Sequence, residues 1–175
     1  MRLRSILTLA MLTFLCGSAE ATEWLMVGAI EFKPVTPQTE WSHTLGMAYL
    51  DARSPVQSLF APVRLPAGAT VTGLWCHAYD RSSTSFVEVE LERWDHLSTS
   101  SSIQGRTVLS ATTSIPLSSG PRTISDSSPD PAYEVIKDWE GLVTTTYFTY
   151  HLRFNSEEGC GPLCGVFSCS IGYEL

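Results

Sequence analysis

The sequence predicts an all-β protein, a two-sheet antiparallel β-sandwich of jelly-roll type. No long segment has apolar residues at helical spacing. Several short segments instead alternate between apolar and polar residues, or run apolar throughout, between clusters of Gly, Pro and Ser. These short strands are too numerous for one small sheet, so we expect two sheets packed face to face.

The expected strands cover residues 25–32, 43–50, 58–65, 69–79, 85–94, 107–114, 122–125, 144–154 and 165–174. The clearest alternates three apolar side chains with three acidic ones: Val87, Glu88, Val89, Glu90, Leu91 and Glu92. Such a strand buries one face, so its glutamates are expected to face water. Residues 138–142 are the one expected helical turn. The Ser- and Thr-rich residues 97–131 are interpreted as strands and exposed loops of the same domain, with a flexible linker as the alternative.

The first 21 residues have the features of a secretory signal peptide. Arg2 and Arg4 precede an apolar run, and Ala19-Glu20-Ala21 is a small-x-small cleavage pattern. The run is shorter than the roughly 20 residues that span a bilayer. We therefore expect cleavage after Ala21 and a single domain over residues 22–175, secreted or periplasmic. A lipid anchor on Cys16 is the less favoured alternative, because the residues before it are bulky.

The charge of the chain disfavours two classes of partner. Removing Arg2, Arg4 and Glu20 leaves 9 basic and 17 acidic residues, a formal charge of −8. Nucleic acids and anionic membranes normally need a basic patch, and no run of Lys or Arg occurs. We expect neither partner, and no membrane insertion after cleavage.

The four cysteines of the mature chain indicate two disulfides, since their number is even and the compartment is oxidising. Cys160 and Cys164 enclose Gly-Pro-Leu, a turn-forming spacer, so they can close a local loop. Cys76 would then pair with Cys169, a long loop whose closure stabilises by roughly 4 kcal/mol. Other pairings remain open, as does a zinc site built from three cysteines and His151, although the spacings match no common zinc motif.

The segment FAPVRLPAGATVTGL at residues 60–74, followed by Tyr79 and Asp80, resembles a loose group of uncharacterised exported bacterial proteins. The resemblance extends over about residues 30–92 and 165–175. It implies a β-sandwich or jelly-roll domain, in some cases attached to larger surface or phage-like proteins. It implies no catalytic residue, and the segment with Cys160 to Cys169 is particular to this chain. Asp80 is expected to be a turn residue.

Trp75, His77 and Tyr79 share one face of their expected strand. If Cys76 points into the core, this aromatic row faces outward and can stack on a sugar or a partner side chain. If the row points inward, it belongs to the core. We propose the row as a ligand-binding site, with that alternative open.

Patterns for catalysis and metal binding are weak. The chain has no Gly-x-Ser-x-Gly elbow, no His-Glu-x-x-His motif and no phosphate-binding glycine loop. Glu88 and Glu90 have a spacing near that of inverting glycosidases, but a solvated acidic face is the simpler interpretation. Asp126 and Asp130 form a weak candidate Ca²⁺ site in a polar loop. His43, His96 and His151 lie far apart and are interpreted as loop or packing residues.

The sequence therefore favours an exported binding module for a glycan or a protein ligand, with no cofactor and no catalysis of its own. The alternative is a structural surface protein that assembles into homo-oligomers through edge strands. A hydrolase with an acidic site of unfamiliar pattern is the third hypothesis.

Overall fold

The computed structural model describes part of the chain, and the account below is confined to that part. It consists of residues 22–34, 36–37, 39–51, 58–66, 68–81, 86–95, 105–113, 120–128, 148–156 and 160–175. The expected signal peptide, the expected helical turn at 138–142, His96 and Asp130 lie outside these residues.

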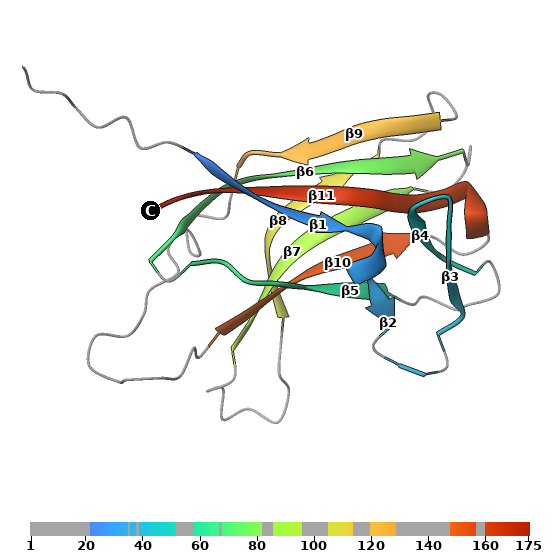
Figure 1. Cartoon of the computed structure of the whole chain (residues 1–175), viewed down its shortest axis with the longest axis horizontal. Coiled ribbons are helices and arrows are strands. Elements are labelled where there is room, and N and C mark those ends of the chain that lie inside the picture. Colours follow the sequence, from blue (N-terminus) through green and yellow to red (C-terminus); the bar gives the residue numbers. More distant parts are fainter. Residues whose placement is uncertain are drawn as a thin grey trace, which may run out of the picture.

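Eleven strands and two short 3-10 turns make up the described chain (Figure 1). In chain order they are β1 (Glu23–Gly28), η1 (Ala29–Glu31), β2 (Lys33–Pro34), β3 (Trp41–Thr44), β4 (Met47–Leu50), β5 (Ser58–Val63), β6 (Thr70–Asp80), β7 (Val87–Asp95), β8 (Gly105–Thr112), β9 (Gly120–Asp126), β10 (Phe148–Ser156), η3 (Gly161–Leu163) and β11 (Cys164–Glu174).

The strands form two antiparallel sheets, which confirms the predicted sandwich. Sheet A has the order β3-β4-β11-β6-β9, and β1 also pairs with β11. Sheet B has the order β2-β5-β10-β7-β8. The orders β4-β11-β6-β9 and β5-β10-β7-β8 are those of the two four-stranded sheets of a jelly roll.

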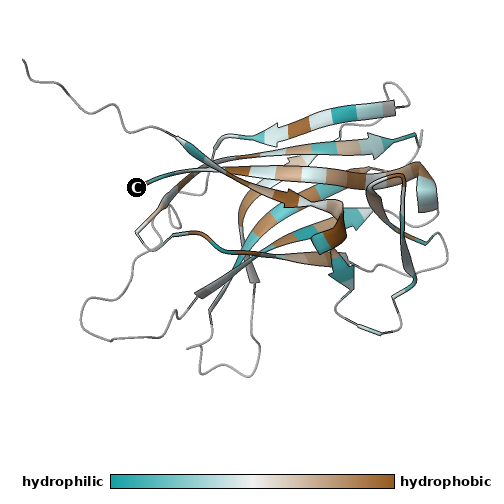
Figure 2. Ribbon diagram, in the orientation of Figure 1, coloured by the Kyte–Doolittle hydropathy of each residue, from teal (hydrophilic) through white to brown (hydrophobic). Residues whose placement is uncertain are grey.

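The core lies between the sheets because each strand turns its apolar alternate positions inward. Hydrophobic and hydrophilic positions accordingly alternate along the strands in Figure 2. The largest fully buried side chains come from both sheets and from the segment before β2: Phe32, Phe154, Leu59, Leu74, Leu91, Leu109, Leu152 and Ile171. Burying this apolar surface is the main force that holds the two sheets together.

Two expected strands differ from the structure. The expected strand 25–32 ends at Gly28, where η1 begins. The expected strand 43–50 is instead a hairpin, because Leu45 and Gly46 both have positive φ, of 50° and 78°. Two such residues make the tight turn that suits a two-residue hairpin. Leucine is unusual there, so the sequence carried little signal for the turn.

Asp80, expected as a turn residue, connects the two sheets. It is buried at the end of β6, and its Oδ2 accepts a hydrogen bond from the Thr113 hydroxyl at 2.6 Å. The Thr113 hydroxyl in turn accepts a hydrogen bond from the backbone N–H of Val87, at 2.9 Å. Asp80 therefore has a structural role beyond its own turn, because it links sheet A to sheet B.

Candidate functional site

The outer face of sheet A carries the predicted aromatic row. In β6, the neighbours Leu74, Cys76 and Ala78 are completely buried in the core. Successive side chains of a strand point to opposite faces, so Trp75, His77 and Tyr79 point outward. His77 is exposed, and the two larger side chains are half-buried. The structure thus places the row on the outer face, in agreement with the outward alternative.

A disulfide fixes which face of β6 points into the core. Cys76 lies directly opposite Cys169 in the β6–β11 register, and the two are bonded. Both are buried, on the core side of the sheet. Cys160 and Cys164 form the second disulfide, around η3. This is the predicted pairing, and it occupies all four cysteines of the part of the chain that the structure describes.

Two tryptophans pack side by side over a floor of glycines. Gly172 of β11 pairs with Gly73 of β6 on one side and with Trp24 of β1 on the other. The Trp75 indole covers Gly73, and its ring lies 2.2 Å from where an added Cβ would stand. The Trp24 and Trp75 rings meet edge to face, with centroids 4.6 Å apart. Trp24 is 53% exposed.

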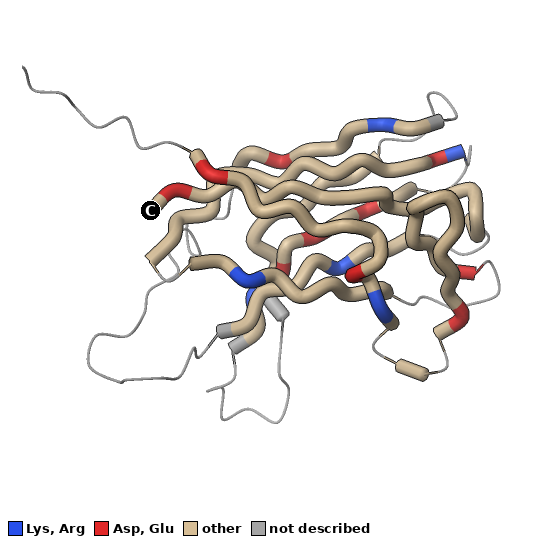
Figure 3. Tube along the Cα trace, in the orientation of Figure 1, with Lys and Arg blue, Asp and Glu red and all other residues tan. Residues whose placement is uncertain are grey.

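The rest of this face is aromatic and hydroxyl-bearing. Tyr79 meets Phe167 edge to face at 6.5 Å, and the Thr123 hydroxyl lies 3.3 Å from Nδ1 of His77. Cross-strand neighbours of the row on β11 and β9 are small: Ser168, Ser170, Thr123, Ser125, Gly165 and Pro121. Between Thr70 and Tyr79, and between Cys164 and Tyr173, neither β6 nor β11 has a charged side chain (Figure 3). We call this surface, from Trp24 through Trp75 and His77 to Tyr79, the aromatic face.

Sequence reasoning missed Trp24 and Phe167. Trp24 joins the row only because β1 pairs with β11, more than a hundred residues away in the chain. Phe167 lies at an irregularity in the β6–β11 register, between Val166 and Ser168. The alternation of β1 could have shown that Trp24 and Met26 share a face. No local signal could have shown which strand would lie beside it.

The outer face of sheet B corrects the expectation that the glutamates of β7 are solvated. They do point away from the core, but Glu90 is only 7% exposed and Glu92 only 3%. The reason is the neighbouring strand: Arg153 of β10 lies opposite Glu90 and makes ion pairs with both carboxylates. The Arg153 Nη1 to Glu92 Oε1 distance is 2.9 Å.

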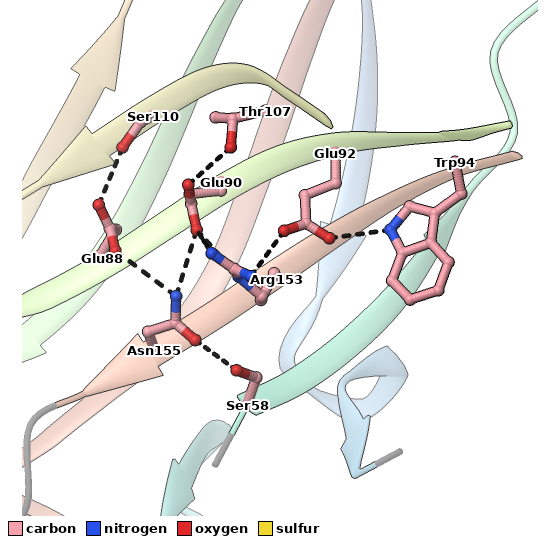
Figure 4. Close-up of polar contacts among 9 residues, drawn as sticks. All are labelled: Ser58, Glu88, Glu90, Glu92, Trp94, Thr107, Ser110, Arg153 and Asn155. Atoms are coloured by element: carbon pink, nitrogen blue, oxygen red, sulfur yellow. Dashed lines mark hydrogen bonds and ion pairs between the residues drawn. The ribbon is translucent and has the colours of Figure 1, made fainter. Parts of the chain in front are cut away.

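Further hydrogen bonds complete this network, which we call the glutamate network (Figure 4). Thr107 donates to Glu90 at 2.9 Å, and Ser110 donates to Glu88 at 3.1 Å. The indole N–H of Trp94 donates to Glu92 at 2.9 Å. The Asn155 amide donates to Glu90 at 3.2 Å and accepts a hydrogen bond from Ser58.

The carboxylates of the glutamate network bind neighbouring side chains of the same sheet. A guanidinium contacts Glu90 and Glu92, and several donors point at their oxygens, so these oxygens already have hydrogen-bond partners within the sheet. The arrangement connects four strands of sheet B, since its residues come from β5, β7, β8 and β10.

The loop at Asp126 and a pocket beside η1 have few free polar groups with which to bind a ligand. Both carboxylate oxygens of Asp126 accept backbone N–H groups, from Ser110 at 3.0 Å and Ser128 at 2.9 Å. Within the described ranges, no three His, Cys, Asp or Glu side chains are grouped to hold a metal ion. A pocket of about 340 Å³ lies between η1 and the β3–β4 hairpin. The polar side chain that lines it, His43, already contacts the Ala29 carbonyl oxygen at 2.8 Å.

Comparisons with known proteins add little to this geometry. No family model matches the chain, and no curated protein matches it. The chain is similar to a solved structure described as Eiger TNF from S. frugiperda, at 11% identity and a TM-score of 0.33. The match covers 87% of this chain and 85% of that one. At so low a TM-score, no functional argument follows. Among the described residues, no helix has the length and apolar character needed to cross a membrane.

Proposed function

We propose that the protein is an exported, non-catalytic binding module whose ligand docks on the aromatic face of sheet A. The observation that carries this proposal is the outward row of Trp75, His77 and Tyr79, which the exposed Trp24 extends. Large aromatic side chains supply much of the binding energy at recognition surfaces. Export rests on the signal-like residues 1–21, and the two disulfides are compatible with an extracellular or periplasmic protein.

Of the two ligand classes, a neutral glycan has the better support. Sugar rings present C–H faces that pack on aromatic rings, and hydroxyls that hydrogen-bond to polar side chains. The aromatic face offers both, since Ser170 and Ser125 flank Trp75, and Ser168 and Thr123 flank His77. It has no charge along the row that would favour an ionic partner.

The same chemistry argues against sheet B as the docking surface. A ligand that bound Glu90 or Glu92 there would have to displace Arg153, since both carboxylates are already desolvated and paired. Leaving a buried charge without its partner is costly. The aromatic face requires no such exchange, because its groups are apolar or weakly polar.

The test is a glycan array and a pull-down with the secreted protein, followed by titration of any hit. Trp75→Ala and His77→Ala are expected to weaken binding by about tenfold or more, as removal of a central anchor does. The matched control is Trp94→Ala, which removes a half-buried tryptophan from the outer face of sheet B. Melting curves show that each variant is folded.

Absence of a specific hit in both screens would count heavily against a binding module. A hit that is lost in Trp94→Ala and kept in Trp75→Ala would move the site to sheet B. A specific hit in the pull-down alone would make the ligand a protein.

A further inference from the structure

Strand β1 is an edge strand of sheet A. Along its whole length, Glu23 to Gly28, it pairs with Tyr173 to Ser168 of β11 (Figure 1). Within the residues that the structure describes, it pairs with no second strand. Its other side therefore presents backbone N–H and C=O groups that can accept a further strand. At its end, the Gly28 N–H already donates to Oε1 of Glu31, at 3.3 Å.

The other edges carry the features that normally block such pairing. β2 consists of Lys33 and Pro34, and β9 contains Pro121 and Arg122. β8 has a register irregularity opposite Leu91 and Glu92, and β3 is polar after its first residue. Lysine, proline and bulges all discourage edge-to-edge pairing.

Strand β1 has none of these features. Its sequence is EWLMVG, with no Lys, Arg or Pro, and hydrophobic colouring extends to its end in Figure 2. Met26 is 71% exposed on the same face as Trp24. A largely apolar edge without lysine, proline or a bulge is a template for a new strand.

We propose that β1 pairs antiparallel with β1 of a second copy of this chain, across a two-fold axis at Met26. In a continuous antiparallel sheet, directly opposed residues share a face. Centring the pair on Met26 places Leu25 opposite the partner's Val27, both on the core side. It places Trp24 opposite the partner's Gly28 on the outer side, where an added Cβ would meet no atom within 4 Å. Each copy thus has room for the other's largest side chain.

Few acidic groups meet in this register, which favours association of an acidic chain. Glu23 is the charged residue of β1, and it lies opposite the partner's Ala29 at the end of the pair, near the Glu31 carboxylate that accepts the Gly28 N–H. The central residues, Trp24 to Val27, carry no charge. The pairing would join two copies of sheet A and place their aromatic faces on one side. It does not depend on a ligand binding there.

The experiment is sedimentation equilibrium of the secreted protein from about 10 µM to 1 mM, a range suited to a small interface. We expect a reversible monomer–dimer equilibrium. Met26→Lys and Met26→Glu each place like charges face to face across the axis, so each should raise the dimer Kd at least about tenfold. A 1:1 mixture of the two variants should restore the dimer. The matched control is Thr123→Lys, which adds the same charge to an exposed position on the other edge of sheet A.

Several results would overturn the proposal. These are a strict monomer at 1 mM, a dimer that persists in Met26→Lys, or a mixture that fails to associate. A second test uses the unsubstituted protein. Amide hydrogen exchange over residues 23–28 should slow as the protein concentration rises. A protein that does not dimerise could still bind a ligand through Trp75 and His77. The ligand titrations of Trp75→Ala and His77→Ala therefore test the proposed function independently of the dimer.

Discussion

The outer faces of the two sheets are built from the same strand alternation, yet they differ in what their side chains do. On sheet B, three glutamates, an arginine and an asparagine bind one another. On sheet A, Trp75, His77 and Tyr79 face outward over serines, threonine and glycines. The glutamates of the first surface are bonded to their neighbours, and the second surface leaves aromatic side chains available. A polar surface can thus be structural while an aromatic one is the better binding candidate.

The largest expected effect on stability comes from replacing Arg153. Replacing it by leucine leaves Glu90 and Glu92 buried without a cation, so the free energy of unfolding should fall by about 2 to 3 kcal/mol. This is below the full cost of breaking a buried pair, because the Arg153 side chain is 33% exposed. Urea unfolding measures the change.

Two further variants sharpen this result. Arg64→Leu removes an exposed arginine and should change stability by less than about 0.5 kcal/mol. Adding Glu90→Gln and Glu92→Gln to Arg153→Leu should recover part of the loss, since no buried charge then remains. An Arg153→Leu protein as stable as the original would show that the glutamate network is not structural.

On sheet A, Gly73→Ala should lower the free energy of unfolding by a smaller amount. The new methyl group would lie 2.2 Å from the Trp75 ring, so the indole must move. We expect a loss of about 1 to 2 kcal/mol, as for other overpacked sites, and a change in tryptophan fluorescence. In a Trp75→Ala background the same substitution should cost much less, which a double-mutant cycle measures.

The control for Gly73→Ala is Gly28→Ala, whose methyl group would enter open space. Equal costs for the two glycine substitutions, or the absence of coupling between Gly73 and Trp75, would contradict the packing of Trp75 over glycine.

The smallest expected effect is on the pH dependence of stability in alkaline solution, to which two tyrosines should contribute differently. Burial raises the pKa of Tyr150 in sheet B, and the nearby Arg93 guanidinium partly opposes this. Because its folded-state pKa lies above the unfolded value near 10, Tyr150 should leave stability unchanged below that pH. Stability should then fall as the pH rises through the folded-state pKa.

In sheet A, the hydrogen bond from the Tyr173 hydroxyl to Glu23 raises the pKa of Tyr173, but that hydroxyl is exposed. Urea unfolding at pH 9, 10 and 11 should therefore show a flatter alkaline decline for Tyr150→Phe and little change for Tyr173→Phe. A larger effect of Tyr173→Phe would reverse this expectation.

Local patterns in the sequence predicted much of the fold. Alternation in Val87–Asp95 and Thr70–Asp80 placed two long strands correctly, because side-chain direction in a strand follows from backbone geometry alone. The Leu45–Gly46 hairpin was missed, since leucine is a rare choice at positive φ. The row of Trp75, His77 and Tyr79 was identified, but only the burial of Cys76 decides which way it points.

The sequence by itself determined that the protein is all-β, which positions alternate, and which residues share a strand face. These features arise from interactions between residues close in the chain. The tertiary structure decided which strands are neighbours, and hence that Arg153 covers Glu90 and Glu92 and that Trp24 packs on Trp75. Those contacts join residues that are distant in the chain, and they depend on the packing of the whole sandwich, which no local pattern encodes.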